Sequence, residues 1–238
     1  HAAPQAAYFA GRAMRQSGKL TAARDHFTST ANRHYDTPEG PLAGLEAAEV
    51  MLELGEPEAA QQALVQTIQR VGPPAQYVNS WITLNDLRER DEAMRERLLA
   101  AHRSDLAVQL SFALPPLVAE NRALELRALA HEQWAQHQAH QAEQAPENER
   151  PAQLSQARRH FRQAGVDFAR LAHLNYTERR YPGDLWRSGR NFARGRDFQS
   201  AITLLRAYLE TEADNQRPRV MVTLGAALLS RGEAAAAA

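Results

Sequence analysis

The feature of this sequence that most constrains its fold is one spacing between small residues, which recurs along the chain. In three places a small residue is followed by another one twelve positions later. The pairs are Gly11 and Ala23, Ala48 and Ala60, and Gly189 and Ala201. Around them, apolar residues recur at intervals of three, four and seven, which is typical of an amphipathic helix. The sequence therefore predicts pairs of short helices that approach each other closely at small residues.

Residues 11–27, GRAMRQSGKLTAARDHF, also contain a Gly-Lys pair, so a phosphate-binding loop is an alternative interpretation of this segment. Such a loop needs a glycine five positions before that pair's glycine, a hydroxyl residue after the lysine, and a strand in front. Ala13 and Leu20 occupy those two positions, and the preceding residues have helical periodicity. The segment is therefore predicted to be one helix, a break at Gly18, and a second helix.

This hairpin resembles the tetratricopeptide repeat (TPR), whose second helix carries an Ala-x3-Phe pair, here Ala23 and Phe27. The pattern recurs 37 residues further on, where Ala48 takes the place of Gly11. A fourth start, at Leu224-Gly225, lies 36 residues after Gly189. The resemblance implies an all-α fold, an α-α superhelix or TPR-like solenoid of about 12 helices.

The repeats also predict the domain organisation. We expect a single TPR-like helical repeat domain over residues 1–238. Its clearest units are expected at 4–37, 41–74, 182–215 and 218–238, with a degenerate unit at 75–113 and an extended one at 117–175. In the degenerate unit, Trp81 suits a first helix, but the sequence that follows is highly charged. The extended unit is predicted to be one hairpin of long helices around a polar loop, either a projecting finger or an insertion without a function of its own.

Composition argues against several classes of function. The 28 basic and 28 acidic residues cancel, so no overall positive field favours nucleic acid or an anionic membrane. Because cysteine is absent, the chain can form neither disulfides nor a cysteine-ligated zinc site. No apolar run approaches the roughly 18 residues that cross a bilayer, so we expect no direct membrane insertion. No catalytic or cofactor motif is present, and we expect neither an enzyme nor a bound cofactor.

Two clusters allow a functional and a structural interpretation. His131, His137 and His140 could offer imidazoles to a metal, but no third-ligand pattern accompanies them, and we expect solvated side chains and no metal site. The stretch YTERRYPGDLW, residues 176–186, combines arginines and aromatics as a binding loop does, yet packing of Trp186 into the hairpin accounts for it more simply.

The chain begins with His1 rather than Met and ends in GEAAAAA within a predicted helix, so we interpret it as a fragment of a larger protein. By resemblance, bacterial proteins of this kind often carry a membrane anchor ahead of the repeats and act in envelope assembly. The compartment, cytoplasmic or periplasmic, stays open.

The resemblance further implies that the first helix of each repeat lines a concave groove that binds a protein or peptide. The predicted groove residues are Tyr8, Arg12, Arg15, Arg190 and Arg194. Arginine pairs well with carboxylates, so an acidic segment or a peptide C-terminus is the expected ligand. Glu49 and Glu53 depart from the asparagine-containing carboxylate clamp of some family members. We therefore expect a non-enzymatic protein-interaction scaffold, and the alternative is a self-association or spacer module of a membrane-anchored bacterial envelope protein.

Overall fold

The computed structural model describes residues 2–115, 117–211 and 213–232, and it divides into two compact units, His1–Ala119 and Glu120–Ala238. Each unit is described by itself below. That the whole chain acts as a single repeat domain stays a prediction.

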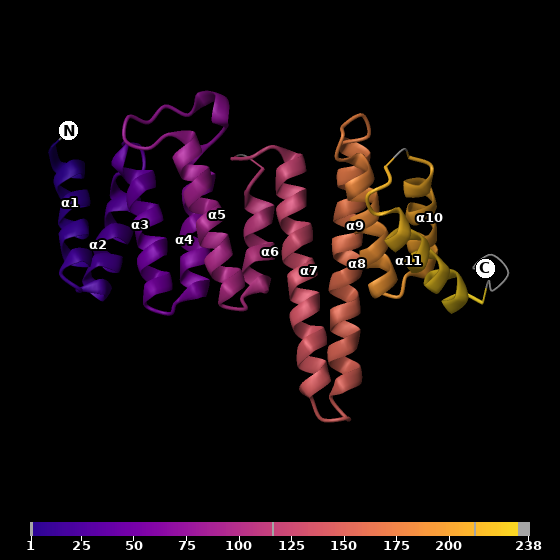
Figure 1. Ribbon diagram of the computed structural model, residues 1–238. Coiled ribbons are helices and arrows are strands. Elements are labelled where there is room, and N and C mark those ends of the chain that lie inside the picture. The colour runs from indigo at the N-terminus through magenta and orange to yellow at the C-terminus, as the bar shows by residue number, and fades with distance from the viewer. Residues whose placement is uncertain (1, 116, 212, 233–238) are drawn as a thin grey trace. The chain divides into compact units, whose positions relative to one another are not determined.

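The first unit consists of consecutive antiparallel helical hairpins (Figure 1). Its helices are α1 (Ala2–Gln16), α2 (Leu20–Arg33), α3 (Glu39–Glu53), α4 (Pro57–Val71), the 3-10 helix η1 (Pro74–Gln76), α5 (Leu84–Ala100) and α6 (Ser104–Ala113). The second unit continues in the same manner. It contains α7 (Glu120–Gln144), α8 (Arg150–Leu174), α9 (Tyr181–Arg194), α10 (Phe198–Leu209) and α11 (Arg217–Ser230).

The predicted all-α fold is thus confirmed, with eleven α-helices and no strand among the residues that the structure describes. The second helix of the predicted last unit, after Gly232, lies outside the described residues. No helix of the described ranges is long and apolar enough to span a bilayer.

The helices pair where the small residues predict close approach. A Cβ atom added to Gly11 would lie 2.6 Å from the ring of Phe27, and one added to Gly189 would lie 2.7 Å from the side chain of Leu205. In both hairpins the two residues are sixteen positions apart, and the second is buried in the core. A glycine on the first helix therefore allows a large side chain of the second helix to pack against its backbone.

The break between paired helices is a residue in the left-handed region. Gly18 and Gly55 supply it in the first two hairpins, with φ of 76° and 78°. In the hairpins α5–α6 and α9–α10 the same conformation is taken by His102 and Arg196, with φ of 59° and 58°. Only the glycines make this turn visible in the sequence, because they adopt positive φ without a steric cost.

The segment between α4 and α5 departs from the predicted helix. Trp81 lies in an extended loop before α5, and a capping box formed by Thr83 and Asp86 starts the helix only afterwards. The Trp81 ring packs instead on α1, 5.6 Å from the ring of Tyr8 and 5.8 Å from that of Phe9. Figure 1 shows this segment crossing one end of the first unit.

The long helices α7 and α8 form the extended hairpin predicted for 117–175. Each has 25 residues, against 12 to 15 for the helices that follow or open the chain, so the hairpin projects beyond its neighbour α9 (Figure 1). The buried side chains of its distal part are small, Ala135, Ala142 and Ala157. Close packing of two backbones, rather than a thick apolar core, holds this part together.

Candidate functional site

Tyr8, the first predicted groove residue, belongs to the core of the first unit. Only 3% of its surface is exposed. Its ring lies between those of Phe27 and Trp81, and its hydroxyl donates a hydrogen bond to Glu46 Oε1 over 3.4 Å. Burial raises the pKa of this hydroxyl, and the nearby Glu46 raises it further. The structure therefore corrects the placement of Tyr8 on an accessible binding surface.

Arg15 binds carboxylates of the chain itself. Its guanidinium lies 2.5 Å from Glu46 and 3.1 Å from Glu49, and it also contacts Glu53. Burial alone would lower the pKa of Arg15, but the bonds to Glu53 and Glu49 outweigh it and hold that pKa above its ordinary value. Arg90 of α5 binds Glu46 and Glu49 at 3.2 and 2.5 Å. Two arginines and three glutamates thus form a closed network across α1, α3 and α5.

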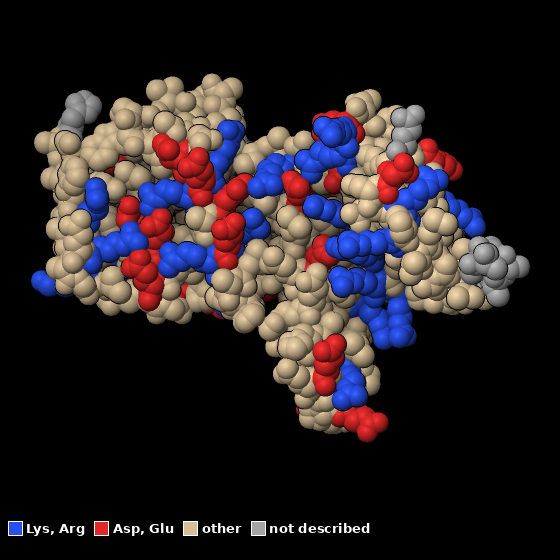
Figure 2. Space-filling view, in the orientation of Figure 1, with Lys and Arg blue, Asp and Glu red and all other residues tan. Residues whose placement is uncertain are grey.

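Arg12 is the exposed member of the predicted groove residues in this unit, and it forms no ion pair with another residue of the described ranges. In Figure 2, basic and acidic atoms alternate over the face of the first unit. Arg12 only balances the negative charge that three glutamates and two arginines leave in the adjacent network, so this surface is a weak site for an acidic ligand.

Arg190 and Arg194 lie together on α9, opposite Glu132 of α7. Their guanidinium nitrogens are 2.5 and 3.7 Å from the same carboxylate oxygen. Each guanidinium also lies near an aromatic ring, Arg190 over Trp186 at 5.8 Å and Arg194 over Phe161 at 5.1 Å. One carboxylate therefore serves two arginines, and the aromatic rings hold both guanidiniums in place.

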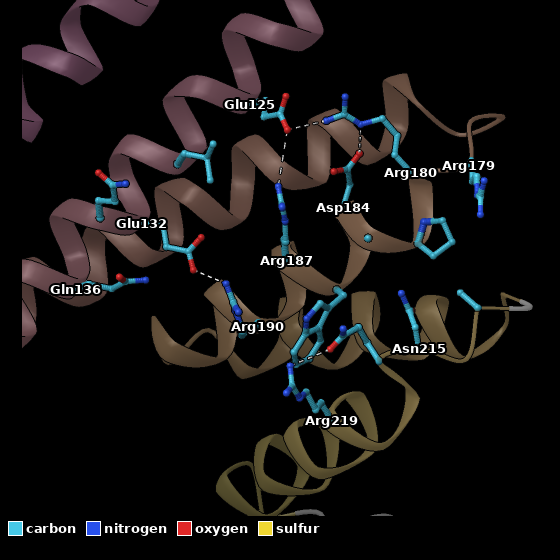
Figure 3. A pocket seen from close by; sticks show the side chains of 17 residues that line it. Glu125, Glu132, Gln136, Arg179, Arg180, Asp184, Arg187, Arg190, Asn215 and Arg219 are labelled. Atoms are coloured by element: carbon cyan, nitrogen blue, oxygen red, sulfur yellow. Dashed lines mark hydrogen bonds and ion pairs between the residues drawn. The ribbon is translucent and has the colours of Figure 1, made fainter. Parts of the chain in front are cut away.

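A cavity of about 790 Å³ opens beside Arg190, between α7, α9 and the start of α11 (Figure 3). Five arginines and three carboxylates line it, a formal excess of two positive charges. They are Arg179, Arg180, Arg187, Arg190 and Arg219, with Glu125, Glu132 and Asp184. Side-chain amides of Gln133, Gln136, Asn215 and Gln216 complete its polar lining. Arg194 does not line this cavity.

The carboxylates of the cavity are each engaged. Glu125 lies 3.1 Å from Arg180 and 3.8 Å from Arg187. Burial raises the pKa of Glu125, but Arg122 and Arg180 outweigh this and hold the pKa below its ordinary value, so the group stays ionised. Asp184 accepts a hydrogen bond from the Asn175 amide at 2.9 Å, and burial raises its pKa. Each of the three carboxylates is thus paired within the protein, and the two excess positive charges of the cavity belong to its arginines.

Four cavity arginines are not among the residues predicted from the sequence: Arg179, Arg180, Arg187 and Arg219. The first three stand in or next to YTERRYPGDLW, for which the sequence favours packing over a binding loop. Trp186 is partly buried. It packs against the core around Leu185, and it also lines the cavity. Arg180 and Arg187 flank the helix start at Tyr181 and both reach toward Glu125, whereas Arg179 lies apart from them (Figure 3).

The histidines differ from the predicted arrangement. His131 is buried rather than solvated, and its ring is stacked near those of Trp134 and His160. His160 lies on the facing helix α8, and no pattern in the sequence predicts its contact with His131. The exposed His140 lies near Glu143. Among the described residues, no three groups of the kind that bind metals come together.

No protein-family model matches the chain, and no curated protein matches it. Two solved structures are similar over most of its length. One is described as a kinesin light chain of Podosopora anserina with nearly identical TPR-like repeats; it is 15% identical, covers 90% of this chain and 96% of its own, and has a TM-score of 0.36. The other is the P58(IPK) TPR domain, 13% identical over 97% of this chain and 89% of its own, with a TM-score of 0.27.

At such scores, neither likeness speaks to what the chain binds. The hairpins themselves carry the fold assignment, through their order and their glycine crossings at matching positions. The fold is TPR-like. The TPR-like hairpins of the second unit place α7, α9 and α11, the first helix of each pair, around the arginine-lined cavity.

Proposed function

We propose that the chain is a non-enzymatic protein-interaction scaffold that binds an acidic segment of a partner in the arginine-lined cavity of its second unit. The observation that carries this proposal is the lining of that cavity, where five arginines meet three carboxylates. Guanidinium groups bind carboxylates through paired hydrogen bonds, and their rigid fork loses little freedom on binding.

The composition of the two units supports this choice of site. Counted along the sequence, residues 1–119 hold 11 basic and 14 acidic side chains, whereas residues 120–238 hold 17 basic and 14 acidic ones. A net charge of zero thus conceals one unit with an acidic excess and one with a basic excess. An acidic ligand is attracted to the second and repelled by the first.

The aromatic contacts strengthen the argument. Arg187 lies over Phe168 and Arg190 over Trp186, at 5.5 and 5.8 Å. A guanidinium held on a ring is already oriented, so binding a ligand orders fewer side-chain torsions. The cavity also has the size of a typical ligand site, and its open form suits a chain segment better than an enclosed small molecule.

Self-association through the long hairpin is the alternative. An interface between copies usually contains a substantial apolar patch. Among the described residues of this hairpin, Val166 and Leu174 of α8 are the large hydrophobic side chains that are about half exposed, and two such residues are fewer than a substantial patch needs. The acidic-segment proposal therefore has the stronger support.

The experiment compares two triple variants that remove the same charge. Arg179→Gln, Arg190→Gln and Arg219→Gln neutralise the cavity, whereas Arg33→Gln, Arg159→Gln and Arg206→Gln neutralise exposed positions away from it. Each is titrated with an end-capped, ten-residue glutamate-rich peptide carrying a fluorophore, and with its glutamine counterpart.

We expect the cavity variant to weaken binding of the acidic peptide about tenfold or more, because each lost charged contact contributes on the order of 1 kcal/mol. The control variant should change the affinity less than threefold, and the glutamine peptide should not bind. Equal weakening by both variants would show that only the overall charge matters and would reject the cavity as the site.

A further inference from the structure

A second cavity, in the first unit, has the opposite chemical character. It has a volume of about 360 Å³ and lies between the start of α1, the α2–α3 loop and the segment that precedes α5. Its lining includes two carboxylates, Asp36 and Glu39, the indole of Trp81 and the rings of Pro4 and Pro38. No lysine or arginine is among the described residues that line it.

Glu39 is the unusual member of this cavity. Only 7% of its surface is exposed, yet its carboxylate forms no hydrogen bond or ion pair with any other described residue. Its carboxylate oxygens are not among the fully buried polar atoms, so the carboxylate of this otherwise buried residue opens onto the cavity, where a ligand can reach it. Its place at the start of α3 brings some stabilisation from the helix dipole but supplies no cation.

The aromatic wall opposite is fixed rather than adaptable. Trp81 is held against the rings of Tyr8 and Phe9. The adjacent Asn79 donates from its side-chain amide to the carbonyl of Pro38 at 2.9 Å and accepts from the backbone N–H of Trp81 at 2.8 Å. These bonds fasten the segment before α5 to the residue next to Glu39, so the indole and the carboxylate stay on the same cavity.

The geometry points to a binding site for an organic cation, a guanidinium or ammonium group on an aliphatic stem. The charged head pairs with the Glu39 carboxylate, and the stem lies along Trp81 and the prolines. Cations bind well against indole faces, and a cation would restore the electrostatic partner that Glu39 lacks. Exposed Asp36 at the cavity adds attraction for positive charge.

Two sources offer this chemistry: a free diamine-like or guanidine-like metabolite, and an arginine or lysine side chain of a partner protein. The site is independent of the acidic-segment cavity, because it belongs to the other unit and selects the opposite charge. Its failure would leave the proposal for the second unit untouched.

The test uses the full chain and isothermal titration with agmatine, with the end-capped tripeptide Gly-Arg-Gly, and with Gly-citrulline-Gly. Citrulline has nearly the shape of arginine but carries no charge. We expect a dissociation constant of about 0.1–1 mM for at least one of the two cations, as befits a ligand of this size, and no detectable binding of the citrulline peptide. Tighter binding of agmatine indicates a free metabolite, and tighter or equal binding of the arginine peptide indicates a protein side chain.

Glu39→Gln keeps the shape of the side chain and should lower the affinity at least tenfold. Glu96→Gln, an exposed carboxylate of α5 away from the cavity, should leave it unchanged. Circular dichroism establishes that both variants are folded, and Trp81→Phe, which keeps an aromatic wall with a weaker attraction for cations, should weaken binding severalfold. Equal affinities of the arginine and citrulline peptides, or unchanged binding by Glu39→Gln, would overturn the proposal.

Discussion

At the scale of the residue, Gly11 and Gly189 have the same role in two hairpins far apart in the sequence. Neither has a positive φ, so backbone conformation does not require glycine there. Glycine is required because the two helices of each hairpin lie close together. A side chain would collide with Phe27 in one hairpin and with Leu205 in the other.

We therefore expect Gly11→Leu and Gly189→Leu each to lower the free energy of unfolding by about 1–3 kcal/mol, the usual cost of overpacking. Gly183→Leu is the matched control, because Gly183 lies on the same helix as Gly189 with open space where its Cβ would be. Urea denaturation measures all three. Midpoints that fall equally for Gly183→Leu and Gly189→Leu would refute the crossing at Gly189.

Asp91 of α5 is a buried acid whose Oδ1 atom has no hydrogen-bond partner in the described structure. Burial raises its pKa to about 7, although Arg95 opposes this. In the unfolded chain the carboxyl ionises near pH 4. Between those values the folded state binds a proton that the unfolded state has lost, so this group lowers stability as the pH rises from 4 to 7.

Asp91→Asn should remove that contribution. We expect the variant to melt at a higher temperature than the wild type at pH 8, with the difference shrinking toward pH 4. Thermal unfolding followed by circular dichroism over this range provides the measurement. A constant difference at every pH would mean that the ionisation of Asp91 does not change on folding.

At the scale of the element, the α7–α8 hairpin combines small buried residues with a ring stack. Trp134 lies 3.8 Å from the ring of His160, and the two Nδ1 atoms of His131 and His160 are 3.2 Å apart. Burial, followed by the proximity of His131, lowers the pKa of His160 to about 4, and burial also lowers the pKa of His131. Arg159 disfavours protonation of His160. At His131, Arg127 disfavours protonation and Asp167 favours it.

The sign of the effect follows from these pKa values. An unfolded histidine titrates near 6.5, so below that pH the unfolded state binds protons that the folded hairpin does not. The stabilisation is complete above about pH 6.5 and is lost as the pH falls toward 4. We expect the melting temperature of the wild type to fall between pH 7 and pH 5 relative to that of His160→Phe, which keeps the stack but cannot be protonated; the opposite contribution of Asp91 is present in both and cancels in this comparison. His140→Phe, at an exposed position, should follow the wild type, and identical profiles for all three would contradict the assignment.

The helical hairpins were largely predictable from the sequence, whereas the long-range packing contacts of their residues were not. Glycine breaks at Gly18 and Gly55 and the twelve-residue spacing located the hairpins because these signals are local. Trp81 was misplaced because its packing on Tyr8 depends on a loop that returns over α1.

The same limit applies to the site. Arg190 was found through helix periodicity, but its shared carboxylate Glu132 is 58 residues away in the sequence. Nothing local distinguishes Arg15, whose glutamates neutralise it, from Arg179, which lines an open cavity. Ion pairs between helices that are distant in the sequence decide which arginines are available to a ligand. The spacing of residues in the sequence does not predict these ion pairs.

At the scale of the whole molecule, each of the two units contains hydrophobic clusters of its own. One cluster gathers Phe27 and Val50 in the first unit, and others gather Phe168 and Tyr208 in the second. We expect residues 1–119 and 120–238, produced as separate chains, each to be helical and to unfold cooperatively. Circular dichroism and calorimetry of the two pieces test this. A piece that lacks a cooperative transition would show that it needs the other unit in order to fold.

The unequal charges of the units have a consequence for handling the protein. A particle that is neutral overall but bears opposite charges on different parts attracts its own copies when few ions are present, since the acidic part of one can approach the basic part of another. Added salt screens that attraction over about 10 Å at 0.1 M. The turbidity of protein solutions near neutral pH should therefore decrease as the sodium chloride concentration is raised from a very low value.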